Sequence, residues 1–208
     1  MAPNPIQLTP DMNTVFVSWR YNNSNPTGTQ YSVKFFSDDG SNGELNTQAV
    51  SGTVGNLKSD TIYHGELIVA GIGSPAYQLH ISLPNTQTLP SPVTKASLRI
   101  DVNSFVAKVD AADTTNSASA KYQFIVNTIP ASTPSTDLKN VGEDLVVENL
   151  SANTTYQLSI VTVGQGGAKS NAFPLGRVAT RANLVTEGTL IEKDLNFVRV
   201  DWKANNPD

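Results

Sequence analysis

The sequence predicts an all-β protein built of tandem β-sandwich domains, with two complete seven-stranded sandwiches and the start of a third. Two observations support this prediction. Short segments alternate between apolar and polar residues, which is typical of antiparallel strands with one buried face. The same landmarks also recur along the 208-residue chain at intervals of 91–93 residues. That interval is the length of a whole domain and exceeds the period of small solenoid repeats.

The alternation defines candidate strands and their buried faces. Clusters of Asn, Gly, Pro and Asp, such as NNSNPTG and SDDGSNG, separate these strands. No segment has the apolar stripe of an amphipathic helix. We therefore expect a core of alternate side chains, which are Val15, Val17 and Trp19 in VFVSW and Tyr31, Val33 and Phe35 in QYSVKFF.

Three phrases recur at the domain interval. NLKSDTIY at 56–63 returns as NLSANTTY at 149–156, and the alternation that begins at Tyr31 returns at Tyr122. The segment VFVSW has counterparts in AKVDA, which ends at Ala111, and in VRVDW, which ends at Trp202. The repeats predict that Trp19, Tyr31 and Tyr122 are core residues. They also place Ala111 where the first domain has a tryptophan.

With these residues the chain resembles tandem fibronectin type III domains over about residues 3–83 and 92–180. The resemblance implies that Tyr63 and Tyr156 are tyrosine corners, whose rings lie in the core while their hydroxyls bind backbone a few residues upstream. It further implies that Leu57 and Leu150 plug the sandwich beneath each corner. Thr61 belongs to the same motif.

The repeats also predict the division of the chain. We assign residues 1–83 to the first module, 84–91 to a proline-rich linker, 92–180 to the second module and 183–208 to the first strands of an incomplete third. Prolines in the linker favour an extended, semi-stiff connection. Because two strands cannot bury a core, we expect the sequence to be part of something longer.

Composition argues against several kinds of partner. The net charge is −4 and charged residues make up only 15% of the chain, so nothing attracts a polyanion such as nucleic acid. No apolar run approaches 18 residues, so we expect no insertion into a membrane. The chain has no cysteine, which excludes disulfides and thiolate chemistry.

Few residues suggest chemistry, and we expect no enzyme activity, cofactor or metal. His64 and His80 are the two histidines, and both fall in predicted strands. No nucleophile, zinc or phosphate-loop motif is present. SDDGSNGE at 37–44 offers oxygen ligands but lacks the spacing of a calcium loop, which favours a hairpin turn.

One loop is a candidate for partner contact. The glycine-rich segment GQGGAKSNAF at 164–173 corresponds to the exposed loop between the last two strands of the second module. Gln165, Lys169 and Asn171 could contact a partner there. The alternative is that the loop is merely long.

These patterns favour a non-enzymatic structural or interaction protein. The preferred hypothesis is a phage virion component of the head decoration, collar or tail, located in the virion and bound to capsid or tail subunits. The alternatives are a secreted or cell-surface bacterial adhesin or spacer that contacts a host glycan or protein, and the accessory modules of a secreted carbohydrate-active enzyme. Fold-level analogy supports all three.

Overall fold

The computed structural model describes residues 6–20, 25–71, 78–111, 116–128 and 137–204. The chain divides into two compact units. Unit 1 comprises Met1–Pro92 and two segments from farther along the sequence, Asp113–Lys121 and Thr162–Asn171. Unit 2 comprises Val93–Ala112, Tyr122–Val161 and Ala172–Asp208. Within the described residues, no helix is long and apolar enough to cross a bilayer.

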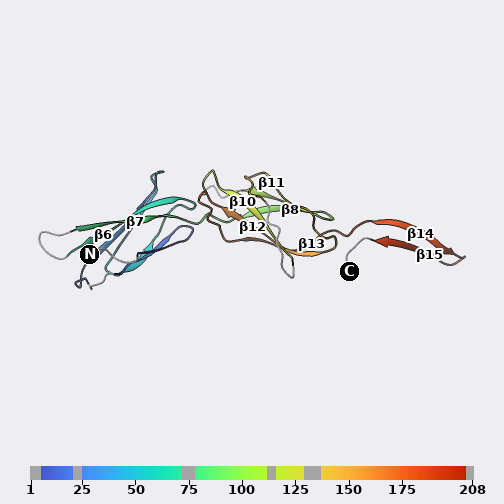
Figure 1. Cartoon of the computed structure of the whole chain (residues 1–208), viewed down its shortest axis with the longest axis horizontal. Coiled ribbons are helices and arrows are strands. Elements are labelled where there is room, and N and C mark those ends of the chain that lie inside the picture. Colours follow the sequence, from blue (N-terminus) through green and yellow to red (C-terminus); the bar gives the residue numbers. More distant parts are fainter. Residues whose placement is uncertain (1–5, 21–24, 72–77, 112–115, 129–136, 205–208) are drawn as a thin grey trace. The chain divides into compact units, whose positions relative to one another are not determined.

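The first sandwich consists of two antiparallel sheets with three and four strands (Figure 1). The three-stranded sheet has the order β1-β2-β5, and the four-stranded sheet has the order β4-β3-β6-β7. The strands are β1 Gln7–Pro10, β2 Val15–Ser18, β3 Gln30–Phe36, β4 Asn42–Thr47, β5 Ser51–Val54, β6 Ile62–Ala70 and β7 Gln78–Gln87. Residues 84–87 thus belong to β7, so the segment that sequence analysis assigned to the linker begins inside a strand.

The second sandwich repeats this arrangement with two three-stranded sheets among the described residues, in the orders β11-β9-β8 and β10-β12-β13. An isolated bridge between Tyr122 and Lys139 occupies the place of β4. The strands are β8 Lys95–Ile100, β9 Phe105–Ala111, β10 Lys121–Thr128, β11 Asp144–Val147, β12 Thr155–Val163 and β13 Phe173–Ala179. The prediction of an all-β fold with tandem sandwiches is therefore confirmed.

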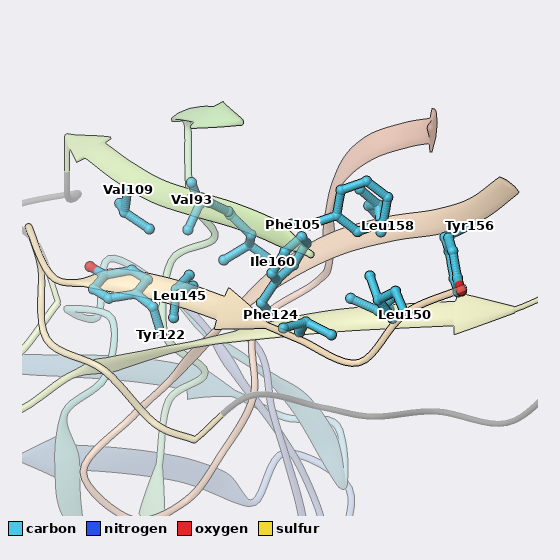
Figure 2. Close-up of a cluster of buried hydrophobic side chains, with 13 residues drawn as sticks. Val93, Phe105, Val109, Tyr122, Phe124, Leu145, Leu150, Tyr156, Leu158 and Ile160 are labelled. Atoms are coloured by element: carbon cyan, nitrogen blue, oxygen red, sulfur yellow. The ribbon is translucent and has the colours of Figure 1, made fainter. Parts of the chain in front are cut away.

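Each sandwich has its own hydrophobic core, formed by the inward-facing residues of its strands. Figure 2 shows the second core, in which side chains from β9, β10, β11 and β12 converge between the sheets. In the first core Trp19 and Tyr31 pack with ring centroids 5.3 Å apart. Trp19, Tyr31 and Tyr122 are at most 4% exposed.

The strand register of the two hairpins shows that the alignment of Ala111 with Trp19 was wrong. The first hairpin ends with Pro10 opposite Val15, and the corresponding hairpin of the second sandwich ends with Ile100 opposite Phe105. Counting four residues along each second strand places Val109, and not Ala111, at the position of Trp19. Similar apolar alternation on both sides of this position concealed the two-residue offset.

The remaining strands, β14 Val185–Lys193 and β15 Val198–Ala204, form a two-stranded antiparallel sheet (Figure 1). Their apolar side chains are exposed, including Leu190, Val198, Val200 and Trp202. A hairpin without a covering layer has no core of its own.

Candidate functional site

The repeated phrase forms a hydrogen-bonded corner at the start of β6. The side chain of Tyr63 is fully buried, and its hydroxyl accepts a hydrogen bond from the Lys58 amide at 2.8 Å. The same hydroxyl lies 3.0 Å from the Ser41 hydroxyl. Leu57, which is 3% exposed, packs beneath this corner in the first core. The tyrosine therefore joins the chain entering β6 to the turn between β3 and β4.

The second corner has the same geometry. The hydroxyl of Tyr156 accepts a hydrogen bond from the Ser151 amide at 3.0 Å, and Leu150 is buried in the second core. The rings of Phe105 and Tyr156 pack edge-on, with their centroids 5.6 Å apart. Asn and Asp tolerate a left-handed backbone better than most residues, and they occupy the tight positions of both corners: Asn56, Asp60, Asn149 and Asn153, all with φ between 48° and 61°.

Two buried threonines form hydrogen bonds to the backbone of the corners, and sequence analysis missed both. The hydroxyl of Thr88 donates to the Lys58 carbonyl at 2.7 Å and accepts from the Thr61 amide at 3.0 Å. In the second sandwich Thr180 bonds the Ser151 carbonyl and the Thr154 amide at 2.6 and 3.0 Å. These threonines lie 92 residues apart, so the domain interval was the signal that could have identified them.

The corner hydroxyls should contribute measurably to stability. Replacement of Tyr63 or Tyr156 by Phe leaves the Lys58 or Ser151 amide without its acceptor. Because such a loss costs about 1–3 kcal/mol, we expect each variant to unfold at lower urea concentration. Ile62→Val, at a neighbouring position that is 42% exposed, is the control and should leave the midpoint unchanged. Equal midpoints for all variants would show that the hydroxyls do not stabilise the corners.

A turn joins the first corner to an acidic side chain. Asp39, between β3 and β4, accepts hydrogen bonds from Ser37 and Ser41 and lies 2.9 Å from the Lys58 ammonium group. The hydrogen bond from Ser37, followed by that from Lys58, holds the pKa of Asp39 well below its usual range. The segment considered for calcium is thus a hairpin turn. Among the described residues no group of three His, Cys, Asp or Glu side chains could hold a metal ion.

Unit 1 also contains a buried carboxylate, that of Asp60, which is 1% exposed. Its Oδ2 accepts hydrogen bonds from the amide and hydroxyl of Ser117 at 3.1 and 2.6 Å. Its Oδ1 accepts from the Gln87 side chain at 2.8 Å and from the Gln165 amide at 3.2 Å. Four donors thus solvate the carboxylate, and three segments that are distant in sequence meet at one side chain.

The chain approaches this carboxylate closely at two glycines. A Cβ built on Gly164 would overlap with the Asp60 carboxylate, and one on Gly166 would overlap with the Gln87 side chain. Of the residues predicted for partner contact, Gln165 is held within unit 1, because its backbone amide and its side chain both donate hydrogen bonds to Asp60. Lys169 forms an isolated antiparallel β-bridge with Val163 across the turn, and Asn171 is exposed.

All hydrogen-bond partners of the Asp60 carboxylate are donors, so they require two acceptor oxygens at this position. In Asp60→Asn the amide nitrogen would face donors, while the left-handed backbone at φ 48° remains tolerable. Because buried donors then lose their acceptor, we expect the free energy of unfolding of unit 1 to fall by about 1–3 kcal/mol. Asp38→Asn is the control, since that side chain is 99% exposed. Denaturation in urea measures both, and an unchanged Asp60→Asn would contradict this role.

Both histidines have ordinary partners on the strand surface. His64 Nδ1 lies 3.0 Å from the Asn85 side-chain oxygen, and His80 Nδ1 lies 2.7 Å from Glu66. The two rings are on the solvent-facing side of their strands and about half exposed. The described residues do not place either histidine beside a nucleophile.

The comparisons with known proteins agree with this architecture. The fold is similar to a two-domain fibronectin type III segment of chicken tenascin, with a TM-score of 0.52 and 17% sequence identity. The match covers 86% of this chain and 99% of the tenascin segment. No protein-family model and no curated protein matches the sequence. The chain therefore has the fold of tandem fibronectin type III domains.

Proposed function

We propose that the chain is a non-enzymatic structural protein of a virus particle, in which it attaches to capsid or tail subunits and displays its sandwiches outward. The observation that carries the proposal is the use of buried polar groups. Tyr63, Tyr156, Thr88, Thr180 and Asp60 all bind backbone or neighbouring turns of their own unit. Such groups stabilise a scaffold, whereas catalysis requires groups aimed at a substrate.

Further features agree with a scaffold role. The fold is one whose usual members are non-catalytic modules. A low content of charged residues suits a protein that presents β-sheet faces to other proteins, because the centres of protein interfaces are depleted of charge. The absence of cysteine is compatible with assembly in a reducing cytoplasm, where disulfides do not persist.

The location of the protein tests this proposal. An antibody against the purified chain is used to follow it through a density gradient of lysate from virus-producing cells, with gold labelling of the particle fraction. We expect the chain to sediment with intact particles and to decorate their surface. Lysate from cells that carry a deletion of the gene is the control.

Two other distributions would overturn the proposal. Recovery in the cell envelope would identify a surface adhesin or spacer that contacts a host glycan or protein. Recovery in the medium, covalently continuous with a glycan-cleaving domain, would identify accessory modules of a carbohydrate-active enzyme.

A further inference from the structure

β7 is the longest strand at the edge of a sheet in the described part of the chain. It has ten residues and ends the order β4-β3-β6-β7, so β6 is its only strand partner among the described residues. In an antiparallel pair, alternate residues exchange backbone hydrogen bonds with one neighbour, and the residues between them direct their N–H and C=O groups to the other side. No other described strand or backbone group bonds that side of β7.

The regular part of this edge consists of residues 78–83. Pro84, which follows them, has no backbone N–H to donate to a further strand. The register between β6 and β7 also shifts at this level, between Tyr63 and Gly65. The six residues before Pro84 pair with β6 without interruption. Residues 78–83 therefore form a straight, unpaired edge, which we call the β7 open edge.

Most other edge strands of the two sandwiches carry features that oppose pairing with a further strand. Short strands, charged residues, prolines and bulges all have this effect. β1, β5 and β11 have only four residues each. β8 carries Lys95 and Arg99, and β13 combines Pro174 and Arg177 with a bulge next to Gly176. The β7 open edge has none of these features, since it contains no proline, no bulge and no Asp, Glu, Lys or Arg.

The first sandwich is covered less completely on the side of β7 than on the side of β4. Where β4 lies against β5, the two sheets approach so closely that a Cβ built on Gly52 would overlap the Leu45 side chain. On the other side β7 contacts β1. There Leu8, Leu79 and Ile81 pack against the first core but remain partly exposed. A further strand beside β7 would therefore cover apolar surface that the sandwich leaves partly open.

The sequence of the β7 open edge meets the requirements for its own partner. A strand added there needs apolar side chains toward the core and polar side chains toward solvent. The edge has this alternation, with partly or fully buried Leu79, Ile81 and Leu83 between exposed Gln78, His80 and Ser82. Antiparallel pairing of two identical strands about a two-fold axis places side chains of the same face opposite one another. Because the edge has no Asp, Glu, Lys or Arg, this pairing brings no such charges together.

We propose that the β7 open edge binds the same edge of a second copy of this chain, so that two four-stranded sheets join edge to edge. The two β7 strands pair antiparallel about a two-fold axis near His80 and Ile81. Leu79 and Ile81 of both copies then lie side by side and extend the apolar layer across the junction. One pair of strands is small beside a stable protein interface, so the dimer forms reversibly and depends on concentration. This inference is independent of where the protein acts.

Analytical ultracentrifugation of the full chain at neutral pH tests the proposal. We expect a monomer–dimer equilibrium for the unmodified chain. His80→Lys brings two positive charges together at the axis and should weaken dimerisation by at least about tenfold, because opposed like charges in an interface are costly. His64→Lys is the matched control, since it makes the same exchange on the solvent-facing side of the inner strand β6, and it should leave the equilibrium unchanged. A monomer at every concentration, or equal effects of the two substitutions, would overturn the proposal.

Cysteine cross-linking locates the contact, because the chain has no cysteine of its own. His80→Cys combined with Ser82→Cys places thiols opposite one another whether His80 or Ile81 lies on the axis. Opposite Cα atoms of an antiparallel pair are about 4.5–5.5 Å apart, a separation that a disulfide can bridge. We expect mild oxidation to give a covalent dimer that is visible on a non-reducing gel and disappears on reduction.

A second pair of cysteines separates contact through the edge from contact through the sheet face. Ser32→Cys combined with Lys34→Cys has the same spacing on the solvent-facing side of β3, an inner strand of the same sheet. We expect this variant to remain monomeric on the gel, and circular dichroism checks that both variants are folded. If the thiols on β3 cross-linked as readily as those on β7, the copies would associate through their sheet faces and the proposal would be overturned. The absence of a cross-link from the folded β7 variant would overturn it as well.

Discussion

Trp19→Ala is expected to lower the free energy of unfolding of unit 1 by about 3–5 kcal/mol, the usual cost of truncating a large core side chain. Trp19 is 1% exposed, and its ring packs against Tyr31. Its Nε1 has no hydrogen-bond partner among the residues that the structure describes, so the loss comes from packing and from the cavity that remains. Because a small domain has only about 5–15 kcal/mol of stability, the variant should be close to unfolded at moderate urea concentrations.

Trp202→Ala is the matched control for this experiment. Its side chain is 62% exposed, so its removal should leave the urea midpoints of both sandwiches unchanged. Trp19→Phe keeps most of the ring volume and gives up no hydrogen bond, and we expect a smaller loss than for Ala. If Trp19→Ala were as stable as the control, the indole would not be the centre of the first core.

The sequence was sufficient to predict those features of the fold that depend on local patterns. Alternation predicts strands because successive strand residues point to opposite faces. The repeated N-L-x-x-x-T-x-Y phrase identified both corners because Leu, Thr and Tyr act within eight consecutive residues. The core positions Trp19, Tyr31 and Tyr122 followed from the same patterns.

Features that depend on distant partners could not be predicted in this way. Asp60 reads as an ordinary turn residue, yet its donors Ser117 and Gln165 lie 57 and 105 residues away. The threonines that clasp the corners, Thr88 and Thr180, stand in segments without alternation. Only the completed tertiary structure shows that their hydroxyls bridge backbone groups on both sides of the corner.

The cores also redistribute volume in a way that no single strand pattern indicates. Where the first sandwich has Trp19, the second has the much smaller Val109 at the same register position. Phe105 of β9 and Phe124 of β10 correspond to Val15 and Val33, and both phenylalanines are fully buried. Phe105 packs against Tyr156 at the corner, whereas Val109 lies farther along β9, on the side of Tyr122 (Figure 2), so the second core has its large aromatic side chains at other places than the first.

Phe105 is the largest fully buried side chain of β9 in unit 2. Phe105→Ala should lower the free energy of unfolding of unit 2 by about 3–5 kcal/mol. The variant loses the edge-on contact with Tyr156 and leaves a cavity beneath the second corner. Urea denaturation followed by circular dichroism measures the loss, and amide exchange at β9 and β12 assigns it to the second sandwich.

Val146→Ala on β11 is the control, because that side chain is 40% exposed and its removal leaves no cavity. Phe105→Leu should recover part of the loss, since it restores most of the apolar volume without the aromatic contact. A further variant, Val109→Trp, places the indole of the first sandwich at a position that is only 2% exposed in the second core. Overpacking costs about 1–3 kcal/mol, so it should destabilise unit 2 and leave unit 1 unchanged. If Val109→Trp were neutral, the second core would contain unfilled space beside Val109.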